Sequence, residues 1–295
     1  MRRALSGFAL ASMLAGPLHA APPEPETLTA SSKWNVNYAD DSCRLLRAFG
    51  TDDALLMVVF DRFAPGREFK LMLVGKRFAN VRSGEQASLQ FGPSELKQEH
   101  DFFSGDLGKG RPALILRGDL RIDAPIKRDR AVRKLEREEA RPNLPPDRIA
   151  AVDQLTLTAP LLRPVRFALG SMPAPFAALD KCIDNLLTNW GIDTQRHATL
   201  SRRAVPTANP GSRLASNDYP QMAIAQGAQG IVNFRLSIDA LGKPTACHIQ
   251  QSSRPQEFDK AACTALMRRA RFTPALDQSG AALASFFRGT VVFKI

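Results

Sequence analysis

The sequence predicts an α+β protein in two parts: a mainly antiparallel β domain that ends in a helix, then a small domain with the order helix–strand–strand–helix–strand. A length of 295 residues suits two domains or one large one. Short apolar runs separated by glycine- and proline-containing turns dominate residues 33–170, as in antiparallel β-structure. The last eighty residues mix two-residue and helical periodicity, which predicts the smaller domain.

Composition excludes several classes of protein. The chain is 44% hydrophobic and 23% charged, close to ordinary globular usage, which excludes a collagen-like, a wholly disordered or a multi-span membrane protein. The formal net charge of +11 is uneven, because residues 199–295 hold 12 basic and five acidic side chains. Such a basic C-terminal third suits nucleic acid, anionic lipid or an acidic protein segment, and charge alone does not choose among them.

The first twenty residues have the pattern of a signal peptide. Arg2 and Arg3 precede the apolar run Ala4–Leu14, and Leu18-His19-Ala20 resembles a cleavage site. The run is shorter than a spanning helix requires. We therefore expect residues 1–20 to be removed and the mature protein to be soluble in the periplasm. The alternative is an uncleaved segment that anchors the protein in the inner membrane, facing the periplasm.

Export changes the interpretation of the four cysteines. None lies in a Cys-x-x-Cys pair and no histidine cluster accompanies them, so zinc binding and dithiol redox chemistry are poorly supported. An even count in an oxidising compartment favours disulfides, for which three pairings are possible. We favour Cys43–Cys182 and Cys247–Cys263, because this pairing keeps one bridge within each predicted domain.

Shifts in composition divide the rest of the chain. Residues 21–32 are polar and proline-rich, typical of a flexible leader. Residues 33–198 form the predicted β domain, whose role the sequence does not indicate. Residues 199–213 contain arginine, proline and glycine without hydrophobic periodicity, so we expect a linker. Residues 214–295 form the second domain.

Within the first domain, five strands and one helix are predicted. The strands cover residues 55–60, 69–73, 87–91, 113–117 and 153–158, and the helix covers 175–190 with one apolar side and Gly191 as its end. The charge-dense stretch 126–141 is expected to be a solvated helix or excursion.

The second domain has a clearer pattern. A short helix begins at Asp218-Tyr219-Pro220, and strands follow at Ile231–Ile238 and Pro244–Gln251. A helix is expected from about Pro255 to Arg269, and a final strand from about Leu283 to Ile295.

This order resembles the C-terminal domain of TonB, the energy transducer that couples the inner membrane to outer-membrane transporters. The resemblance covers about residues 214–295, and it depends on the order and spacing of several short motifs. These are Tyr219-Pro220 with Ala223; Gly227 and Gly230; Asp239 and Gly242 in the hairpin; Ser252-Ser253; Phe258-Asp259 with Ala261-Ala262; Ala265–Ala275; and the closing Val291-Val292-Phe293-Lys294-Ile295.

The resemblance implies a binding domain without catalysis. In that family the last strand, and the segment before the Tyr-Pro pair, receive an extended peptide from an outer-membrane transporter by strand addition. The partner-binding positions implied here are Leu214, Ser216, Asp218, Ser285, Phe286, Arg288, Thr290 and Val292. This prediction requires that the protein's own first half leave the edge of the last strand free.

Two further points concern function. A full transducer has an uncleaved membrane helix and a long proline-rich span, whereas this chain has a folded domain and a short linker, so energy transduction stays open. The alternative to a binding protein is a periplasmic enzyme or ligand-binding protein with its site in residues 33–198, near Asp40, Asp41 or His100. No catalytic motif or triad accompanies them. We therefore predict a non-enzyme without cofactor, metal or nucleic-acid partner, in an oligomeric state that the sequence does not set.

Overall fold

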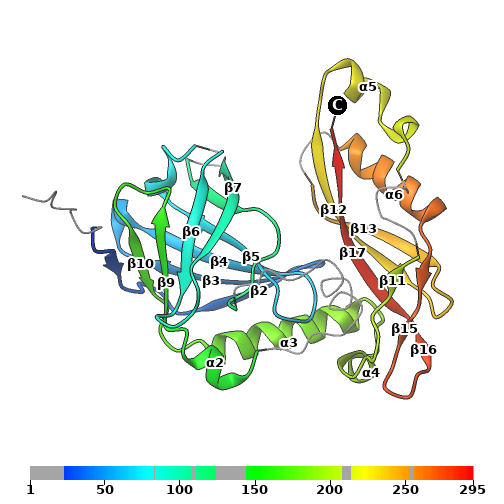
Figure 1. The fold of residues 1–295 in the computed structure, drawn as a ribbon, viewed down its shortest axis with the longest axis horizontal. Helices are drawn as coiled ribbons and strands as arrows, with labels where there is room; N and C mark the ends of the chain where they lie inside the picture. The colour runs from blue at the N-terminus through cyan, green and yellow to red at the C-terminus, as the bar shows by residue number, and fades with distance from the viewer. Residues whose placement is uncertain are drawn as a thin grey trace, which may run out of the picture.

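The structure is a computed structural model that describes residues 23–82, 84–107, 110–123, 144–207, 214–252 and 256–294. It consists of an N-terminal unit (residues 26–198), built on a large curled sheet, and a C-terminal unit (residues 199–294), built on a small sheet (Figure 1). The predicted α+β class is confirmed. The signal-like segment and the charge-dense stretch 126–141 lie outside the described residues.

The N-terminal unit contains a ten-stranded sheet in the order β1-β10-β9-β6-β7-β8-β5-β4-β3-β2. All neighbours pair antiparallel except β1 and β10. The bounds are β1 Glu26–Leu28, β2 Asn35–Tyr38, β3 Cys43–Phe49, β4 Leu56–Arg62, β5 Lys70–Val74, β6 Gln86–Phe91, β7 Gln98–Asp106, β8 Pro112–Leu116, β9 Gln154–Ala159 and β10 Val165–Ala168, with 3-10 turns η1 Asp52–Ala54 and η2 Lys76–Phe78. The five predicted strands correspond to β4, β5, β6, β8 and β9.

Strand β7 joins the two halves of this sheet. Its first four residues pair with β6, and residues 102–106 pair with β8. The sheet therefore bends along β7 and encloses one continuous apolar core, rich in phenylalanine rings. Rings such as Phe60, Phe69 and Phe91 meet edge-on or tilted, in arrangements favoured by the ring quadrupole.

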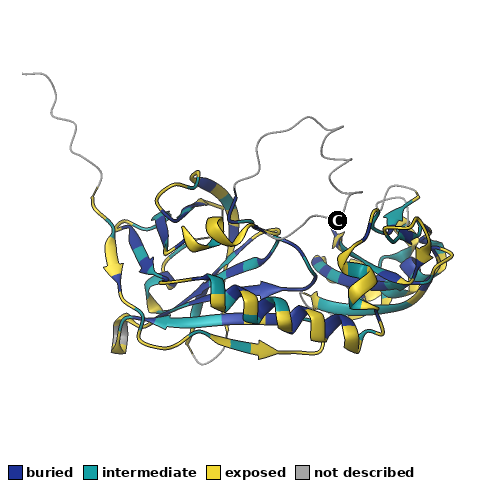
Figure 2. Ribbon diagram, turned by 90° about the horizontal axis from the view of Figure 1, so that it is seen from below, coloured by how far each residue is buried: buried dark blue, intermediate teal, exposed yellow. Residues whose placement is uncertain are grey.

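Helix α3 (Pro173–Asn189) confirms the predicted helix at 175–190 and packs on β2 and β3. Prolines in its first turn lack a backbone N–H that the helix would leave unpaired anyway, and Gly191 follows its end at φ +73°. Figure 2 shows that exposed and buried positions alternate along α3, as expected for a helix with one side packed on the sheet. Cys182 on its buried side forms a disulfide with Cys43 on β3, as expected. No helix among the described residues is long and apolar enough to span a bilayer.

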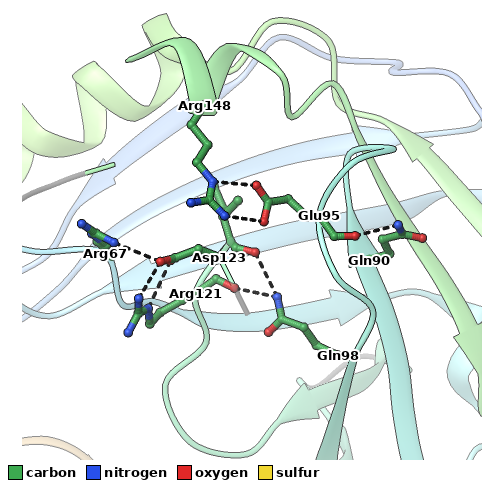
Figure 3. A network of polar contacts seen from close by, with 8 residues as sticks. Arg67, Gln90, Glu95, Gln98, Arg121, Asp123 and Arg148 are labelled. Carbon is green, nitrogen blue, oxygen red and sulfur yellow. Dashed lines mark hydrogen bonds and ion pairs between the residues drawn. The ribbon is translucent and has the colours of Figure 1, made fainter. Parts of the chain in front are cut away.

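A network of arginines and carboxylates fastens the loops at one end of the N-terminal unit (Figure 3). Asp123 accepts hydrogen bonds from Arg121, at 2.5 and 3.1 Å, and from Arg67, at 3.0 Å. Burial raises the pKa of Asp123, but these two arginines outweigh it and the pKa is lowered. Arg148 on α2 (Pro146–Ala150) makes a two-pronged ion pair with Glu95. The network therefore ties α2 to the connection between β6 and β7, and the loop after β8 to the connection between β4 and β5.

Two segments that the sequence predicts to be free are packed instead. In the expected leader, 21–32, strand β1 pairs with β10, and Leu28 is buried in the core. In the expected linker, 199–213, Leu200 is buried in the core of the C-terminal unit, and β11 (Val205–Pro206) pairs with β14. Single apolar residues without periodicity carry this packing, so the sequence pattern did not indicate it. Residues 208–213 lie outside the described residues.

The C-terminal unit has a three-stranded antiparallel sheet in the order β13-β12-β17. The element order predicted for the second domain is confirmed. The bounds are η4 Ser216–Asp218, α5 Gln221–Ala225, β12 Gly230–Ile238, β13 Pro244–Ser252, α6 Glu257–Arg269, β14 Phe272–Thr273, β15 Ala275–Leu276, β16 Ala282–Leu283 and β17 Ser285–Phe293, preceded by α4 Thr194–Ala198 in the N-terminal unit.

Helix α6 covers one face of this sheet and closes a second apolar core. Phe258 on α6 stacks on Phe293 of β17 with ring centroids 4.3 Å apart, and Tyr219 meets both rings edge-on. The expected disulfide between Cys247 and Cys263 joins β13 to α6. These contacts fix the position of β17 against the helix.

Candidate functional site

Strand β17 lies at the edge of the three-stranded sheet. It pairs with β12 over its whole length, from Phe293 opposite Gly230 to Ser285 opposite Ile238, and with no other strand among the described residues. In the part of the chain that the structure describes, the backbone N–H and C=O groups of its second edge are paired with no strand, the arrangement that accepts an added strand. Thr290 is exposed, and Val292 is exposed to 62%.

Successive side chains of β17 point to opposite faces of the sheet. Phe287, Val291 and Phe293 belong to the core under α6. Residues 286, 288, 290 and 292 therefore point to the other face, which is turned towards the N-terminal unit. In Figure 1 the sheet stands between α6 on one side and the N-terminal unit on the other, so its strand edges are not covered by α6.

The N-terminal unit covers the first residues of β17, so the requirement that the first half leave this edge free is not met at Ser285, Phe286 and Arg288. Phe286 meets Trp190 edge-on, with centroids 5.4 Å apart, and stacks on the ring of His197 at 5.3 Å. Ser285 is only 4% exposed, and its Oγ lies 3.1 Å from Nε2 of His197. Burial lowers the pKa of His197 to about 4, with Arg203 acting in the same direction, so the ring is neutral at ordinary pH.

Arg235 lies at the centre of the contact between the two units. Its side chain, on β12, is 3% exposed, and its guanidinium lies 3.8 Å from the ring centroid of Trp190. It donates to Asp41 at 3.3 Å and to Ser237 at 3.1 Å, while its Nε has no hydrogen-bond partner among the described residues. Burial lowers the pKa of Arg235, and the charge of Asp41 opposes that shift.

Arg288 makes the corresponding contact from β17. Its guanidinium lies 5.1 Å from the Phe63 ring centroid, and its Nε donates to Gln250 at 3.0 Å. The nearest carboxylate is Asp119, at 3.9 Å, and burial lowers the pKa of the arginine. Arg235 and Arg288 are directly opposite on paired strands, so their like charges repel each other. The carboxylates and rings of the N-terminal unit offset this repulsion and the cost of burying both guanidinium groups. The contact between the units thus combines aromatic rings with charged and polar groups.

The segment expected to receive a peptide upstream of Tyr219 is folded as a turn. Leu214 is half-buried against the C-terminal core, and Ser216 is exposed in η4. Asp218 accepts a hydrogen bond from the backbone of Ala215 at 2.6 Å and forms a two-pronged ion pair with Arg269. The hydrogen bond from Arg269 is the largest cause that lowers the pKa of Asp218 to about 2. This segment is therefore tied to the end of α6.

The residues considered for an enzyme or ligand site do not come together. Asp41 pairs with Arg235, Asp40 is exposed with its carbonyl accepting from Trp190, and His100 on β7 is hydrogen-bonded to Gln98. A hollow of about 520 Å³ in the N-terminal unit is lined mainly by proline and leucine and contains none of these three residues. Among the described residues, these three side chains therefore form no common site.

Sequence reasoning missed the residues that join the units, among them Asp41, Phe63 and Trp190. On an amphipathic strand, polar side chains such as those at 235 and 288 are expected to face solvent. One signal was present: Phe286 and Phe287 are adjacent, so one of them had to point away from the α6 core. An aromatic residue on the polar face of a strand indicates a second packing partner.

Comparison with known families agrees with the structure of the C-terminal unit. Residues 215–295 match the family model described as Gram-negative bacterial TonB protein C-terminal, which confirms the resemblance predicted for about 214–295. The match begins beyond the N-terminal unit. No curated protein matches the chain.

Proposed function

From the premise that residues 215–295 are a TonB C-terminal domain, a non-enzymatic binding domain, we propose that this chain binds an extended segment of an envelope partner by strand addition to β17. The family implies an outer-membrane transporter as the partner and a link to energy-dependent transport. The unpaired edge of β17, with Thr290 and Val292 exposed beside it, is the observation that carries the proposal.

Backbone pairing supplies the affinity in this proposal. Each hydrogen bond between the partner and β17 contributes about 0.5–1.5 kcal/mol net, so several in a row are needed for useful affinity. The basic charge of residues 199–295 supports an acidic partner, because complementary charge raises the rate of encounter. We therefore expect association to slow as the salt concentration rises.

The two disulfides support a location in an oxidising compartment. We place the protein in the periplasm, as the family implies, either soluble or anchored in the inner membrane and facing the periplasm. Cell fractionation, combined with the N-terminal mass of the native protein, distinguishes the two forms. A mass beginning at Ala21 in the soluble periplasm indicates cleavage, whereas a retained Met1 in the membrane indicates an anchor.

The proposal is tested by methylating the backbone of a bound peptide. A peptide from the plug of an outer-membrane transporter is titrated into the full chain, and single N-methyl groups are then placed along it. Strand addition turns every second N–H of the peptide towards β17. Binding should therefore fall by tenfold or more at alternate positions and change little between them.

A matched control separates backbone pairing from side-chain recognition. Thr290→Val keeps the strand propensity and the backbone of β17 while removing a hydroxyl, so affinity should stay within about twofold. A loss at consecutive positions of the methyl scan, or no binding by any transporter peptide, would remove strand addition as the function.

A further inference from the structure

Exposure changes along the free edge of β17. Ser285 is 4% exposed although it lies on an edge strand, and Phe286 and Arg288 are held by rings and polar groups of the N-terminal unit. Thr290 and Val292 share a sheet face with Phe286 and Arg288, and among the described residues no ring or charged group of the N-terminal unit covers them. The edge therefore has a covered first part and an open second part.

The cover would also obstruct an added strand. A strand pairing with β17 lies about 4.8 Å from it and carries side chains on both faces of the sheet. On the face turned to the N-terminal unit, Trp190 and His197 occupy the space around Phe286, and Phe63 lies over the Arg288 guanidinium. Side chains of a partner at those positions would have to displace rings that are packed in the contact between the units.

Gly289 marks the change between the two parts. It lies on the α6 face of the strand, between Phe287 and Val291, where the ring of Phe234 fills the space that a side chain would need: a Cβ there would lie 2.6 Å from Cζ of Phe234. Beyond it, β17 runs on past the covered region towards the C-terminus, at the end of the sheet away from α4 (Figure 1).

We infer that the N-terminal unit closes the first part of the β17 edge and so confines an incoming strand to Gly289–Phe293, a segment of about five residues and 17 Å. This inference rests on the proposed strand addition and gives the N-terminal unit a role within it. The unit sets the length and the register of the paired segment, because a partner strand ends where the covered part of β17 begins.

The contact is suited to this role because it fixes the two units against each other at several points. Arg235 is held by Trp190 and Asp41, and Lys70 donates to Gln251 of β13 at 3.2 Å. At the base of the sheet, Arg196 forms an ion pair with Asp277 at 2.6 Å. A second unit that moved freely on a linker could not exclude part of an edge, whereas one fastened at these points can.

The test is a peptide length series on the full chain. Peptides of five, seven and nine residues, all from one transporter plug segment, are compared by affinity and by amide hydrogen exchange along β17. We expect the nine-residue peptide to bind within about threefold of the five-residue peptide. Exchange should slow at residues 289–293 and stay unchanged at 285–288.

A double substitution removes the cover, with a matched control. Trp190→Ala with His197→Ala should extend the slowed exchange to 286–288 and let the nine-residue peptide bind several-fold tighter than the five-residue one. His100→Ala, which removes a histidine of the N-terminal unit outside the contact, should behave as the wild type. The wild-type length series stands even if the double variant folds poorly.

The possible outcomes distinguish a failure of the length limit from a failure of strand addition itself. Slowed exchange over 285–288 in the wild type, or a tenfold gain in affinity from five to nine residues, overturns the length limit and leaves strand addition intact. Absence of any slowed exchange on β17 with all three peptides overturns both.

Discussion

Removal of the Trp190 ring should loosen the contact that holds the two units together. The ring lies between Phe286 and Arg235, so one side chain of the N-terminal unit contacts two strands of the small sheet. Trp190→Ala removes both contacts and leaves the buried guanidinium with Asp41 as its remaining charged partner. Trp190→Phe retains a ring at the same place and serves as the matched variant.

The size of the effect follows from the geometry. The edge-on pair with Phe286, at 5.4 Å, contributes about 1 kcal/mol, and the cation–π contact with a nearly desolvated arginine contributes about 1–2 kcal/mol. The indole N–H donates to the Asp40 carbonyl at an exposed position, where its loss costs little. We expect Trp190→Ala to lower the free energy of unfolding by about 2–3 kcal/mol, and Trp190→Phe by about 1 kcal/mol.

Urea unfolding followed by far-ultraviolet circular dichroism measures this change with both disulfides intact. Once the contact is weakened, the two units should separate into two transitions, because each has its own core. Leu162→Ala, at a side chain 98% exposed on the far loop, should leave the curve unchanged. A Trp190→Ala curve within about 0.5 kcal/mol of the wild type would refute the account of the contact.

Two further predictions concern the C-terminal unit. The hydrogen bond from Arg269 lowers the pKa of Asp218 in the folded protein from 3.8 to about 2, so the ionised carboxylate stabilises the fold above pH 4 and this stabilisation is lost as the pH falls towards 2. Between pH 6 and pH 2 the urea midpoint should therefore decline less steeply in Asp218→Asn than in the wild type. Equal slopes would contradict this. Gly289→Val forces its Cβ to within 2.6 Å of the buried Phe234 ring and should cost about 1–3 kcal/mol in thermal unfolding, whereas Gly105→Ala, with a nearest side-chain atom at 3.4 Å, should cost less than half as much.

The elements with strong periodicity were predictable from the sequence. The α6 helix, the β12–β13 hairpin and the final strand each carry an apolar repeat bounded by glycine or polar turns, and the structure has them within a few residues of the predicted ends. The fold of the N-terminal unit was less predictable from the sequence. Strands such as β2, β7 and β10 are short or polar. They form because they pair with strands distant in the sequence, and a local residue pattern does not show such pairing.

The candidate site was predictable only as an edge. The resemblance indicated that the last strand receives a partner, and it placed Thr290 and Val292 among the partner-binding positions; the structure has both exposed at an edge strand. They gave no indication that Ser285 and Arg288, on the same strand, are covered by residues about 90 to 220 positions earlier in the chain. Contacts between parts of the chain far apart in sequence leave no local period, so the division of the edge required the structure.

The central claim is that the backbone of β17 pairs with the backbone of a partner. Nuclear Overhauser contacts between a bound transporter peptide and the amide and α protons of Gly289–Phe293, in the isotope-labelled full chain, measure that pairing directly. The account predicts a continuous ladder of cross-strand contacts along this segment. A peptide that binds with its backbone contacts elsewhere, on β13, α5 or the N-terminal unit, would contradict it.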